Sequence, residues 1–569
     1  MATLVLRAVG TAVGGAIGGS FLGVTAATIG GAIGAAAGSY IDSWLISTTL
    51  PDQTIEGQRL DRLQVTTSTE GAVIPRVFGR MRIGGNIIWA SDFREEINQQ
   101  TQGGGKGGGP KVTTTTYAYY ASFAIALCEG VITGVDRIWA DGELMDLHGV
   151  AWRWYAGDET QEPDPLIKAK MNEAPAYRGT AYLVFEELLL ESYGNRIPQI
   201  TVEVFHPLLD GTPEGRLQSV TLIPASGEYV YATRQVTKTE GGAKTTGINV
   251  NAEATQADLI GALNRLQASA SNIQSISLVV AWFGDDLRCE TCKIRPGVDQ
   301  PAKNASTSWS VNGVSRSDAF LVSRDDKGDP VFGGTPADFS VVEAIKEIKA
   351  RGLRVTFYPF ILMDIPPNNT LPDPYSDDAS TIGQPAYPWR GRITCSPAPG
   401  FAGSPDKSEA AVGQVSALFG SAAIGDFSVS GTSVSWTGPS GDWGLRRMIL
   451  HYAHLCKAAG GVDAFLIASE MRVLNQVRGP ANSFSAIEQW SSLLSDVRSV
   501  VGSDTKLSYA ADWSEYFGFR SAGDSGDLFF HLDPIWAHEA CAFIGIDNYM
   551  PLSDWRDGFD HLDAQIHPH

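Results

Sequence analysis

The sequence predicts a multidomain protein of mixed α+β and α/β class, and three observations support this. The chain has 569 residues, which is too long for one hydrophobic core, so we expect three or more structural units. Residues 60–205 are rich in β-branched and aromatic side chains, which favour strands. From residue 276 onward, apolar strand-like runs alternate with amphipathic helical segments, which indicates a parallel sheet flanked by helices.

The first fifty residues differ from the rest because residues 8–41 carry no charged side chain. Their glycines recur four apart: Gly10, Gly14 and Gly18, then Gly30, Gly34 and Gly38. In an apolar helix this spacing exposes backbone along one stripe, so we predict glycine-zipper helices in residues 1–50, either continuous or broken near 25–28. A membrane anchor and packing against other copies of the segment both fit. A secretory signal does not, because the apolar run is too long and its basic region is only Arg7.

Residues 74–146 are predicted to form β-strands around one long exposed hairpin. Residues 113–126 are almost entirely Thr, Tyr, Phe, Ile and Ala, the composition of a strand packed on both faces. The run GGGKGGG at 103–109 would form the hairpin tip, and Asp141-Gly142 marks a tight turn. The stretch holds no nucleophile, metal cluster or phosphate loop, so we interpret it as a structural or assembly module.

The segments that follow are less regular. Residues 183–191 fit a helix or a strand equally well, and 199–205 alternate in polarity like a strand. A Pro/Gly-rich break at 206–215 is a candidate domain boundary. Residues 219–247 predict a strand pair and a loop. Residues 255–268 predict an amphipathic helix with Thr255 as its N-cap.

The C-terminal half predicts an incomplete (β/α)8 barrel. The predicted strands cover residues 276–283, 353–361, 464–469, 506–511 and 542–549. The predicted helices cover residues 339–350, 443–459 and 485–501. Residues 366–441 are rich in Pro, Gly and Ser and predict an insertion over one barrel mouth. Five or six of eight strands can be counted, so we expect further sequence to complete the sheet.

Polar side chains lie towards or directly after the C-terminal ends of the predicted strands, where barrel enzymes place their functional groups. They are Tyr358, Glu470, Asp512, Trp513, Asp547 and Tyr549. Aromatic faces stack on sugar rings, and a pair of carboxyl groups can cleave a glycosidic bond. The pattern therefore indicates a sugar-binding cleft.

Charge and cysteine usage limit the other possibilities. A net charge of −20 argues against a nucleic-acid grip, which needs a basic face. DNA sliding through an acidic channel fits this charge, but we favour the simpler explanation that it keeps a large protein soluble. Cys289 and Cys292 form a C-x-x-C without a partner pair, which predicts a local disulfide or two thiols instead of zinc. We predict no metal and no cofactor.

The β-rich region resembles a known family. VFGRMRIGGNIIWASD (77–92), YAYYASFAIALCEG (117–130) and RIWADGELM (137–145) resemble the hub region of phage tail-tip proteins. The similarity is greatest to the large baseplate hub protein of gene transfer agents, and more distant to lambda-type host-specificity tail proteins. It covers residues 51–207. The resemblance implies a ring of identical subunits, usually three, at the tail tip of a virion-like particle assembled in the bacterial cytoplasm.

The C-terminal half carries a second resemblance. GVDAFLIASEM, KLSYAADWSEYFG and FIGIDNYMPLSDW resemble the barrel domain of the same hub protein, which is similar to glycoside hydrolase barrels. The resemblance implies that Glu470 is the general acid/base. Ser469 departs from the family, which has Asn there, and the second carboxylate expected on a seventh strand is missing unless Asp512 or Asp547 replaces it. We therefore favour a barrel kept for structure or glycan binding over a catalytic one.

Together these observations predict four regions: a glycine-zipper segment at 1–50, a β-rich tail hub domain at 51–215, a connecting region at 216–272 and the incomplete barrel at 273–569. The hypothesis is a baseplate hub that joins tail tube to tip and gates the channel for DNA delivery. Its expected partners are copies of itself, tail tube and other baseplate proteins, DNA bound without sequence specificity and cell-envelope glycans, with a membrane contact through the N-terminal segment left open. The alternative is a cell-wall glycoside hydrolase anchored by its N-terminus.

Overall fold

The computed structural model describes residues 20–21, 24–25, 53–56, 71, 73–102, 112–207, 211–223, 226–240, 244–251, 256–378, 380–521, 526–554 and 556–562. The chain divides into two compact units. The first comprises Met1–Gly215 with Asn264–Ser271, and the second comprises Arg216–Leu263 with Asn272–His569. The four-region division stays a prediction.

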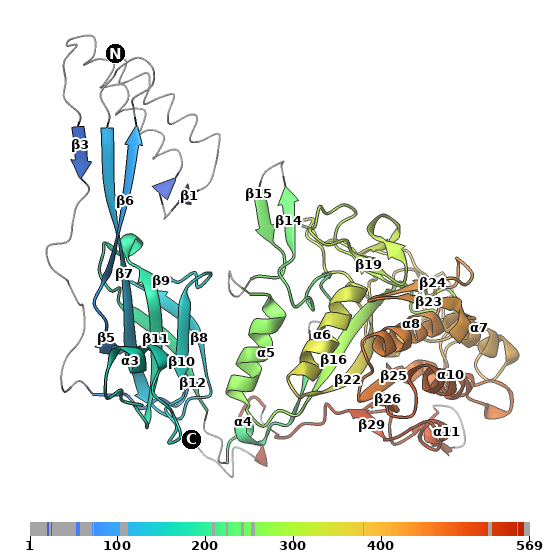
Figure 1. Ribbon diagram of the computed structural model, residues 1–569. Helices are drawn as coiled ribbons and strands as arrows, with labels where there is room; N and C mark the ends of the chain where they lie inside the picture. Colours follow the sequence, from blue (N-terminus) through green and yellow to red (C-terminus); the bar gives the residue numbers. More distant parts are fainter. Residues whose placement is uncertain are drawn as a thin grey trace, which may run out of the picture. The chain divides into compact units, whose positions relative to one another are not determined.

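The first unit contains a six-stranded sheet organised around one long strand. Its strands are β3 (Gln53–Glu56), β5 (Asn86–Ala90), β6 (Arg94–Gln102), β7 (Val112–Glu129), β10 (Ala151–Tyr155) and β11 (Thr180–Leu189). β5, β6 and β11 pair with β7 antiparallel, and β3 pairs with it in parallel. Figure 1 shows β6 and β7 side by side as a long ribbon. Residues 121–128 of β7 are buried on both faces as predicted, but most of residues 113–120 are only partly buried.

A second, four-stranded sheet completes this unit. It contains, in order, β4 (Gly79–Gly84), β12 (Ile200–His206), β8 (Gly134–Ala140) and β9 (Glu143–Leu144). The predicted turn between β8 and β9 is confirmed: Asp141 and Gly142 both have positive φ, 51° and 92°, as a tight hairpin of this hand requires. Phe123 and Phe185 of one sheet share a core with Val202 and Val204 of the other. Short helices accompany the sheets: α3 (Pro165–Lys170), η1 (Glu191–Tyr193) and α4 (Pro213–Arg216), the last ending at the first residue of the second unit.

The second unit is built on a parallel sheet. Its parallel strands, in spatial order, are β13 (Ser219–Leu222), β16 (Ser275–Gly284), β22 (Arg354–Met363), β25 (Ala464–Ser469), β26 (Lys506–Asp512) and β29 (Gly545–Asp547). The short strand β17 (Ile294–Arg295) adds to β16 antiparallel. Because these six strands run parallel, all of them end at the same edge of the sheet.

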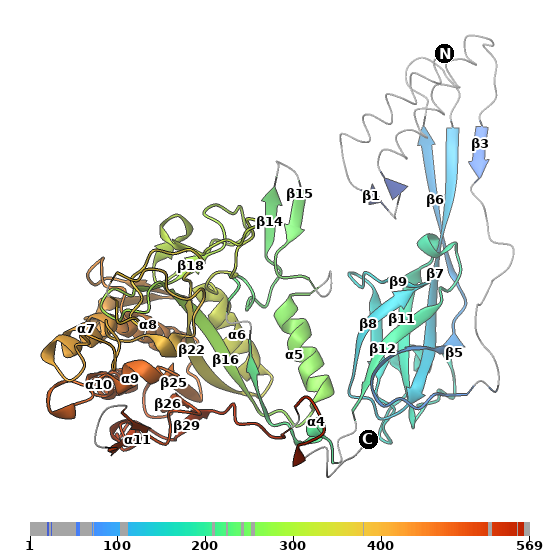
Figure 2. The same ribbon diagram turned by 180° about the vertical axis from the view of Figure 1, so that it is seen from behind.

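Helices flank this sheet, as Figures 1 and 2 show. They are α6 (Asp338–Ala350), α7 (Glu409–Phe419), α8 (Leu445–Ala458), α9 (Arg472–Gln476), α10 (Ser485–Val501) and α11 (Asp533–Trp536). The helix α5 (Asp258–Ser269) is divided between the units, since its residues from Asn264 onward belong to the first. On the helix side, Phe357 packs against Tyr452 of α8 and stacks on Phe465. On the opposite side, Val279, Tyr358 and other buried residues form a separate apolar cluster.

The second unit also contains short helices and two-stranded pairs outside the parallel sheet. They are η2 (Arg316–Asp318), η3 (Arg390–Arg392), η4 (Ile424–Asp426) and η5 (Pro480–Asn482), with the strand pairs β14 (Thr237–Glu240) and β15 (Lys244–Gly247), β18 (Gly297–Val298) and β21 (Phe320–Leu321), β19 (Ser310–Val311) and β20 (Val314–Ser315), β23 (Phe427–Ser430) and β24 (Ser433–Trp436), and β27 (Phe519–Arg520) and β28 (Leu528–Phe529). The predicted insertion at 366–441 thus contains structure of its own, including η3 and α7.

Several predicted elements are confirmed with small shifts. β25 and α10 have the predicted bounds. The ambiguous segment 183–191 lies mainly in strand β11. The strand predicted at 542–549 shortens to Gly545–Asp547, where a Cβ on Gly545 would lie 2.6 Å from the Tyr509 carbonyl oxygen. Close approach of β26 therefore requires glycine at that point.

Other predictions need correction or concern residues outside the described part of the chain. The strand pair expected in 219–247 is the hairpin β14–β15, while β13 joins the parallel sheet. In the predicted glycine-zipper segment the structure describes a two-residue strand pair, β1 (Ser20–Phe21) with β2 (Val24–Thr25), where we expected helix. The β-branched Val24 and Thr25 favour this extended form. The rest of residues 1–50, Thr255 and the hairpin tip at 103–109 lie outside the described residues.

Within the described part of the chain, no helix combines the length and the apolar character that crossing a membrane requires.

Candidate functional site

Glu470 directly follows β25, at the edge where the parallel strands end. Its backbone N–H donates to the carbonyl of Ala510 at 2.9 Å, which continues the pairing of β25 with β26. Its φ is +50°, in the left-handed region that a residue with a long side chain rarely adopts. Strain of this kind persists only where the surroundings enforce it, and it is concentrated at functional sites.

The Glu470 carboxylate is enclosed, with its side chain only 5% exposed. Oε2 accepts a hydrogen bond from the indole N–H of Trp389 at 2.7 Å and lies 3.0 Å from Nη2 of Arg390. Oε1 is buried and has no hydrogen-bond partner. Oε2 is therefore occupied by two fixed donors, while the protonated carboxyl of Asp547 and the Tyr549 hydroxyl can also donate to the Glu470 carboxylate.

Arg390 is held firmly against the end of β25. Its Nε donates to the Ser469 carbonyl at 3.0 Å, and its Nη2 donates to the Ser469 hydroxyl at 2.7 Å. Its guanidinium lies 3.7 Å from the ring centre of Phe360 on β22. These contacts fix the cation that partners Glu470 before any ligand arrives.

Asp547, the last residue of β29, belongs to the same cluster. The Tyr358 hydroxyl of β22 donates a hydrogen bond to its Oδ2. Burial and the negative charge of Glu470 raise the pKa of Asp547 to about 7, against the opposing effects of the Tyr358 hydrogen bond and of Arg390. Near neutral pH this carboxyl group therefore exchanges a proton readily, as a general acid or base must.

The two tyrosines differ in exposure. Tyr358 is buried, and burial raises the pKa of its hydroxyl above the ordinary value. Tyr549 is 67% exposed, yet partial burial of its hydroxyl and the charges of Glu470 and Asp547 raise its pKa as well. Tyr549 thus lies at the rim of the cluster.

The sequence predicted that Asp512 and Trp513 belong to the same cluster as Glu470 and Asp547, but their side chains are placed elsewhere. The Asp512 carboxylate turns into its own loop, where it accepts hydrogen bonds from the Ser514 backbone N–H at 2.9 Å and from the Ser514 hydroxyl. Trp513 is 40% exposed beside it. A substrate-binding role for these two residues stays a prediction, whereas Glu470, Tyr358, Asp547 and Tyr549 are brought together.

Sequence reasoning missed Trp389 and Arg390. Trp389 directly precedes the short helix η3, and Arg390 is the first residue of that helix. Both lie inside the insertion at 366–441, far in sequence from the ends of the strands that carry the other site residues. The only available signal was the prediction that this insertion covers one mouth of the sheet. No spacing rule connects it to Glu470.

Metal and disulfide chemistry find no support in the residues described. No group of three His, Cys, Asp or Glu side chains there could hold a metal ion. Cys289 and Cys292 are buried free thiols, which decides between the two alternatives left open by their spacing. Burial raises the pKa of the Cys292 thiol to about 12, so it is protonated and unreactive at neutral pH.

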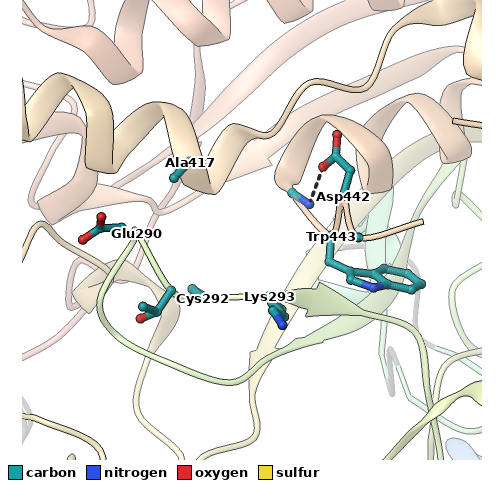
Figure 3. A pocket seen from close by; sticks show the side chains of 9 residues that line it. Glu290, Cys292, Lys293, Ala417, Asp442 and Trp443 are labelled. Atoms are coloured by element: carbon teal, nitrogen blue, oxygen red, sulfur yellow. Dashed lines mark hydrogen bonds between the residues drawn. The ribbon is translucent and has the colours of Figure 1, made fainter. Parts of the chain in front are cut away.

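A separate pocket of about 500 Å³ opens elsewhere on the second unit. Figure 3 shows Glu290, Cys292 and Lys293 on one side and Asp442 and Trp443 on the other. The Asp442 carboxylate is already occupied by hydrogen bonds from the N–H groups of Gly444 and Ser421 and from the Ser421 hydroxyl. The pocket therefore presents no unsatisfied buried acceptor of the kind that Glu470 offers.

Comparison with known proteins identifies the type of domain in which this site lies. Residues 443–569 match the model of the GTA TIM-barrel-like domain, where GTA stands for gene transfer agent. This match confirms the barrel-like domain and the resemblance to gene transfer agent proteins. A search of the curated proteins found no match.

Solved structures with similarity to the chain include three of note. A chain of the virion of a native gene transfer agent particle is 34% identical, with 34% of this chain and 43% of that chain covered and a TM-score of 0.22. A GH113 β-1,4-mannanase is 13% identical, with 51% and 56% covered and a TM-score of 0.25. A GH113 β-mannanase from Alicyclobacillus acidocaldarius is 14% identical, with 43% and 46% covered and a TM-score of 0.20. The chain thus spans about half the length of each, and our assignment rests on the family match alone.

Proposed function

We propose that this chain is a structural protein of a gene transfer agent particle, located at the baseplate hub of its tail. The match of residues 443–569 to the GTA TIM-barrel-like domain carries this proposal. In this role the β-rich unit joins the tail tube to the tip and helps to gate the channel for DNA, while the barrel-like unit contacts glycans of the cell envelope.

Features of the first unit support a role in assembly. Around β4, at the edge of the four-stranded sheet, large apolar side chains are exposed, including Val73 (90%), Phe78 (56%) and Met81 (54%). An open strand edge with exposed apolar groups is typical of a surface that another protein covers. We propose that identical copies, three in number, meet through this unit.

A map of the intact particle tip tests the assembly proposal. We expect several copies of the chain around the tail axis, with the β-rich units forming the ring. Light scattering of the purified full chain provides a second measurement, for which we expect an oligomer that Met81→Asp weakens. A monomer at all concentrations, together with a tip map that lacks the chain, would contradict the hub.

The glycan contact rests on the cluster around Glu470. Its partly exposed aromatic rim, Trp389 and Tyr549, offers faces for sugar rings, and Glu470 Oε1 offers a buried acceptor for a sugar hydroxyl. We expect the full chain to bind purified envelope glycans, and expect Tyr549→Ala to reduce binding. Trp154→Ala is the matched control, because Trp154 is an exposed aromatic of the first unit, at 37%. Equal loss in both variants would contradict a glycan site at the strand ends.

One observation favours glycosidic cleavage as a second candidate function. Hydrolysis requires one protonated and one ionised carboxyl group, and Asp547 faces Glu470 with a pKa of about 7. Asp547 would donate its proton to the leaving oxygen as the glycosidic bond breaks, and Glu470 would take a proton from the water that adds to the sugar carbon. Because protonated Asp547 hydrogen-bonds to Glu470 in the free chain, this step requires the two carboxyl groups to move apart so that the sugar and the water fit between them. Release of reducing sugar ends from envelope glycans, abolished by either Glu470→Gln or Asp547→Asn, would support cleavage. Unchanged glycan in the presence of the chain would reject it and leave binding.

A further inference from the structure

Behind Glu470 lies a fully buried polar network centred on the Tyr509 hydroxyl. This oxygen accepts a hydrogen bond from the Met471 backbone N–H at 2.8 Å and another from the Asn475 side-chain amide at 2.9 Å. Its own proton points to Glu515, whose two carboxylate oxygens lie 3.1 and 3.3 Å away. A tyrosine hydroxyl has one donor and two acceptor positions, so all of its hydrogen-bonding capacity is used here.

Glu515 ties this network to the neighbouring strand end. Its carboxylate, fully buried, accepts from the Asn475 amide at 2.7 Å and from the Asp512 backbone N–H at 3.2 Å. The Trp490 indole N–H donates to the Asn475 carbonyl oxygen at 2.8 Å, which sets the orientation of that amide. A single buried carboxylate therefore joins α9, which follows β25, to the end of β26.

The network acts on the backbone at the point where Glu470 is strained. Two residues of β26 accept hydrogen bonds from successive backbone N–H groups after β25. The Ala510 carbonyl accepts from the Glu470 N–H, and the Tyr509 hydroxyl accepts from the Met471 N–H. Asn475 lies in α9, the short helix that starts at Arg472 directly after this point. A residue with φ of +50° relaxes unless its neighbours prevent it, and these two hydrogen bonds prevent it.

We propose that Tyr509 is a positioning residue for Glu470, anchored by Glu515 and Asn475, and that its hydroxyl keeps the Glu470 carboxylate within reach of Trp389, Arg390 and Asp547. This inference rests on the proposed glycan site. Neither Tyr509 nor Glu515 makes a hydrogen bond to the Glu470 side chain, so the effect travels through the backbone of residues 470–471.

The indole N–H of Trp389 reports on the position of Glu470 without any ligand, because it donates to Glu470 Oε2. We would follow its NMR signal in the full chain labelled at tryptophan and assign it with Trp389→Phe. The groups that face Asp547 are Tyr358, Glu470, Arg390 and Tyr549, so a titration of this signal with a midpoint near pH 7, absent in Asp547→Asn, reports the ionisation of Asp547.

In Tyr509→Phe, which removes only the hydroxyl, we expect the Trp389 signal to move towards that of a free indole. We also expect the midpoint of its titration to fall below about 7, because the charge of Glu470 no longer adds to the effect of burial on the pKa of Asp547. Tyr452→Phe in α8 is the matched control. It removes an equally buried hydroxyl, which accepts a hydrogen bond from the indole N–H of Trp282 in β16, and we expect it to leave both readouts unchanged.

An unchanged Trp389 signal and midpoint in folded Tyr509→Phe would overturn the inference. If that variant fails to fold, Glu515→Gln is used for the test. We expect it to shift the Trp389 signal and its titration midpoint in the same directions by a smaller amount. No change in either readout would again overturn the inference. Glycan binding is measured separately. If wild type binds no glycan while Tyr509→Phe still shifts the Trp389 signal, the proposed function fails and the positioning role stands.

Discussion

Glu203 in the first unit and Asp547 in the second are both carboxylates on strands, yet their surroundings move their pKa values in opposite directions. Glu203 on β12 receives hydrogen bonds from Arg80 at 2.8 Å and from Arg137 at 3.0 Å. These arginines outweigh burial and lower the pKa of Glu203 to about 2. Asp547 faces another carboxylate, and burial raises its pKa to about 7.

The difference distinguishes the two sites. At Glu203, arginines match the buried carboxylate, an arrangement that holds strands together. At the strand ends of the second unit, Asp547 and Glu470 converge instead, although other buried carboxylates of that unit, such as Glu228, are paired with cations. Groups placed so that their charges conflict lower stability, and such conflict is characteristic of functional sites. The comparison can be tested by changing one carboxylate at a time.

The largest effect is expected for Asp164→Ala in the first unit. The buried Asp164 accepts from Arg153 Nη2 at 3.0 Å, from the Tyr155 hydroxyl at 2.7 Å and from the Leu166 N–H at 2.8 Å, where it caps α3. Its removal leaves partners unpaired and should lower the free energy of unfolding of this unit by about 3 kcal/mol. Urea unfolding of the full chain measures this. Asp164→Asn, which keeps the cap and the side-chain volume, should lose less, and an equal loss would assign the effect to the lost charge that pairs with Arg153.

The pH dependence carried by Glu203 comes next. Its pKa of about 2 lies below the ordinary 4.5, so its stabilisation is complete above the ordinary value and is lost as pH falls through 2. We expect the free energy of unfolding of the first unit to drop by about 2 kcal/mol more in wild type than in Glu203→Gln between pH 6 and 2. Parallel curves for the two proteins would show that the arginines do not act through Glu203.

Asp547 should produce a pH dependence of the opposite sign. Its raised pKa means that the folded chain holds a proton that the unfolded chain has released, between the ordinary value of 3.8 and about 7. The free energy of unfolding of the second unit should therefore decrease as pH rises across that interval, by about 1 kcal/mol after allowance for its partial exposure. Asp547→Asn should remove this slope. If the free energy of unfolding of the second unit instead rose with pH, as expected for the first unit through Glu203, the contrast between the two carboxylates would be lost.

The smallest effect is expected for Glu470→Gln. Glutamine keeps an oxygen for Trp389 and Arg390 and removes the repulsion with Asp547, and these two changes oppose each other. We expect the free energy of unfolding at pH 8 to change by less than about 1 kcal/mol. The pKa of Asp547 should fall at the same time. A large destabilisation would mean that Glu470 is a structural group comparable to Asp164.

Some elements follow from local pattern alone. β25 and α10 could be bounded from sequence because both combine a clear apolar period with polar or glycine-bearing ends. Glu470, Asp547 and Tyr358 could be nominated because parallel strands in sequential order end at one edge. The bounds of β29 could not be found, since its shortening depends on how closely β26 approaches Gly545.

The fate of Asp512 shows the limit of the strand-end rule. Asp512 and Asp547 are register partners at the ends of β26 and β29, so sequence treats them alike. The structure separates them because Ser514 occupies the Asp512 carboxylate, whereas Tyr358 and Glu470 surround Asp547. Which way a side chain turns depends on partners that the strand pattern does not contain.

The amino-acid order alone determined the alternation of strands and helices, the edge at which acidic and aromatic groups gather and the resemblance to gene transfer agent proteins, because these depend on short-range periodicity and motif. Only the tertiary structure decided that Trp389 and Arg390, from a distant insertion, contact the Glu470 carboxylate and that Asp547 lies beside it. The same is true of the hydrogen bond from the Met471 N–H to the Tyr509 hydroxyl next to Glu470. Such contacts arise from three-dimensional packing across many tens of residues, for which a linear pattern holds no signal.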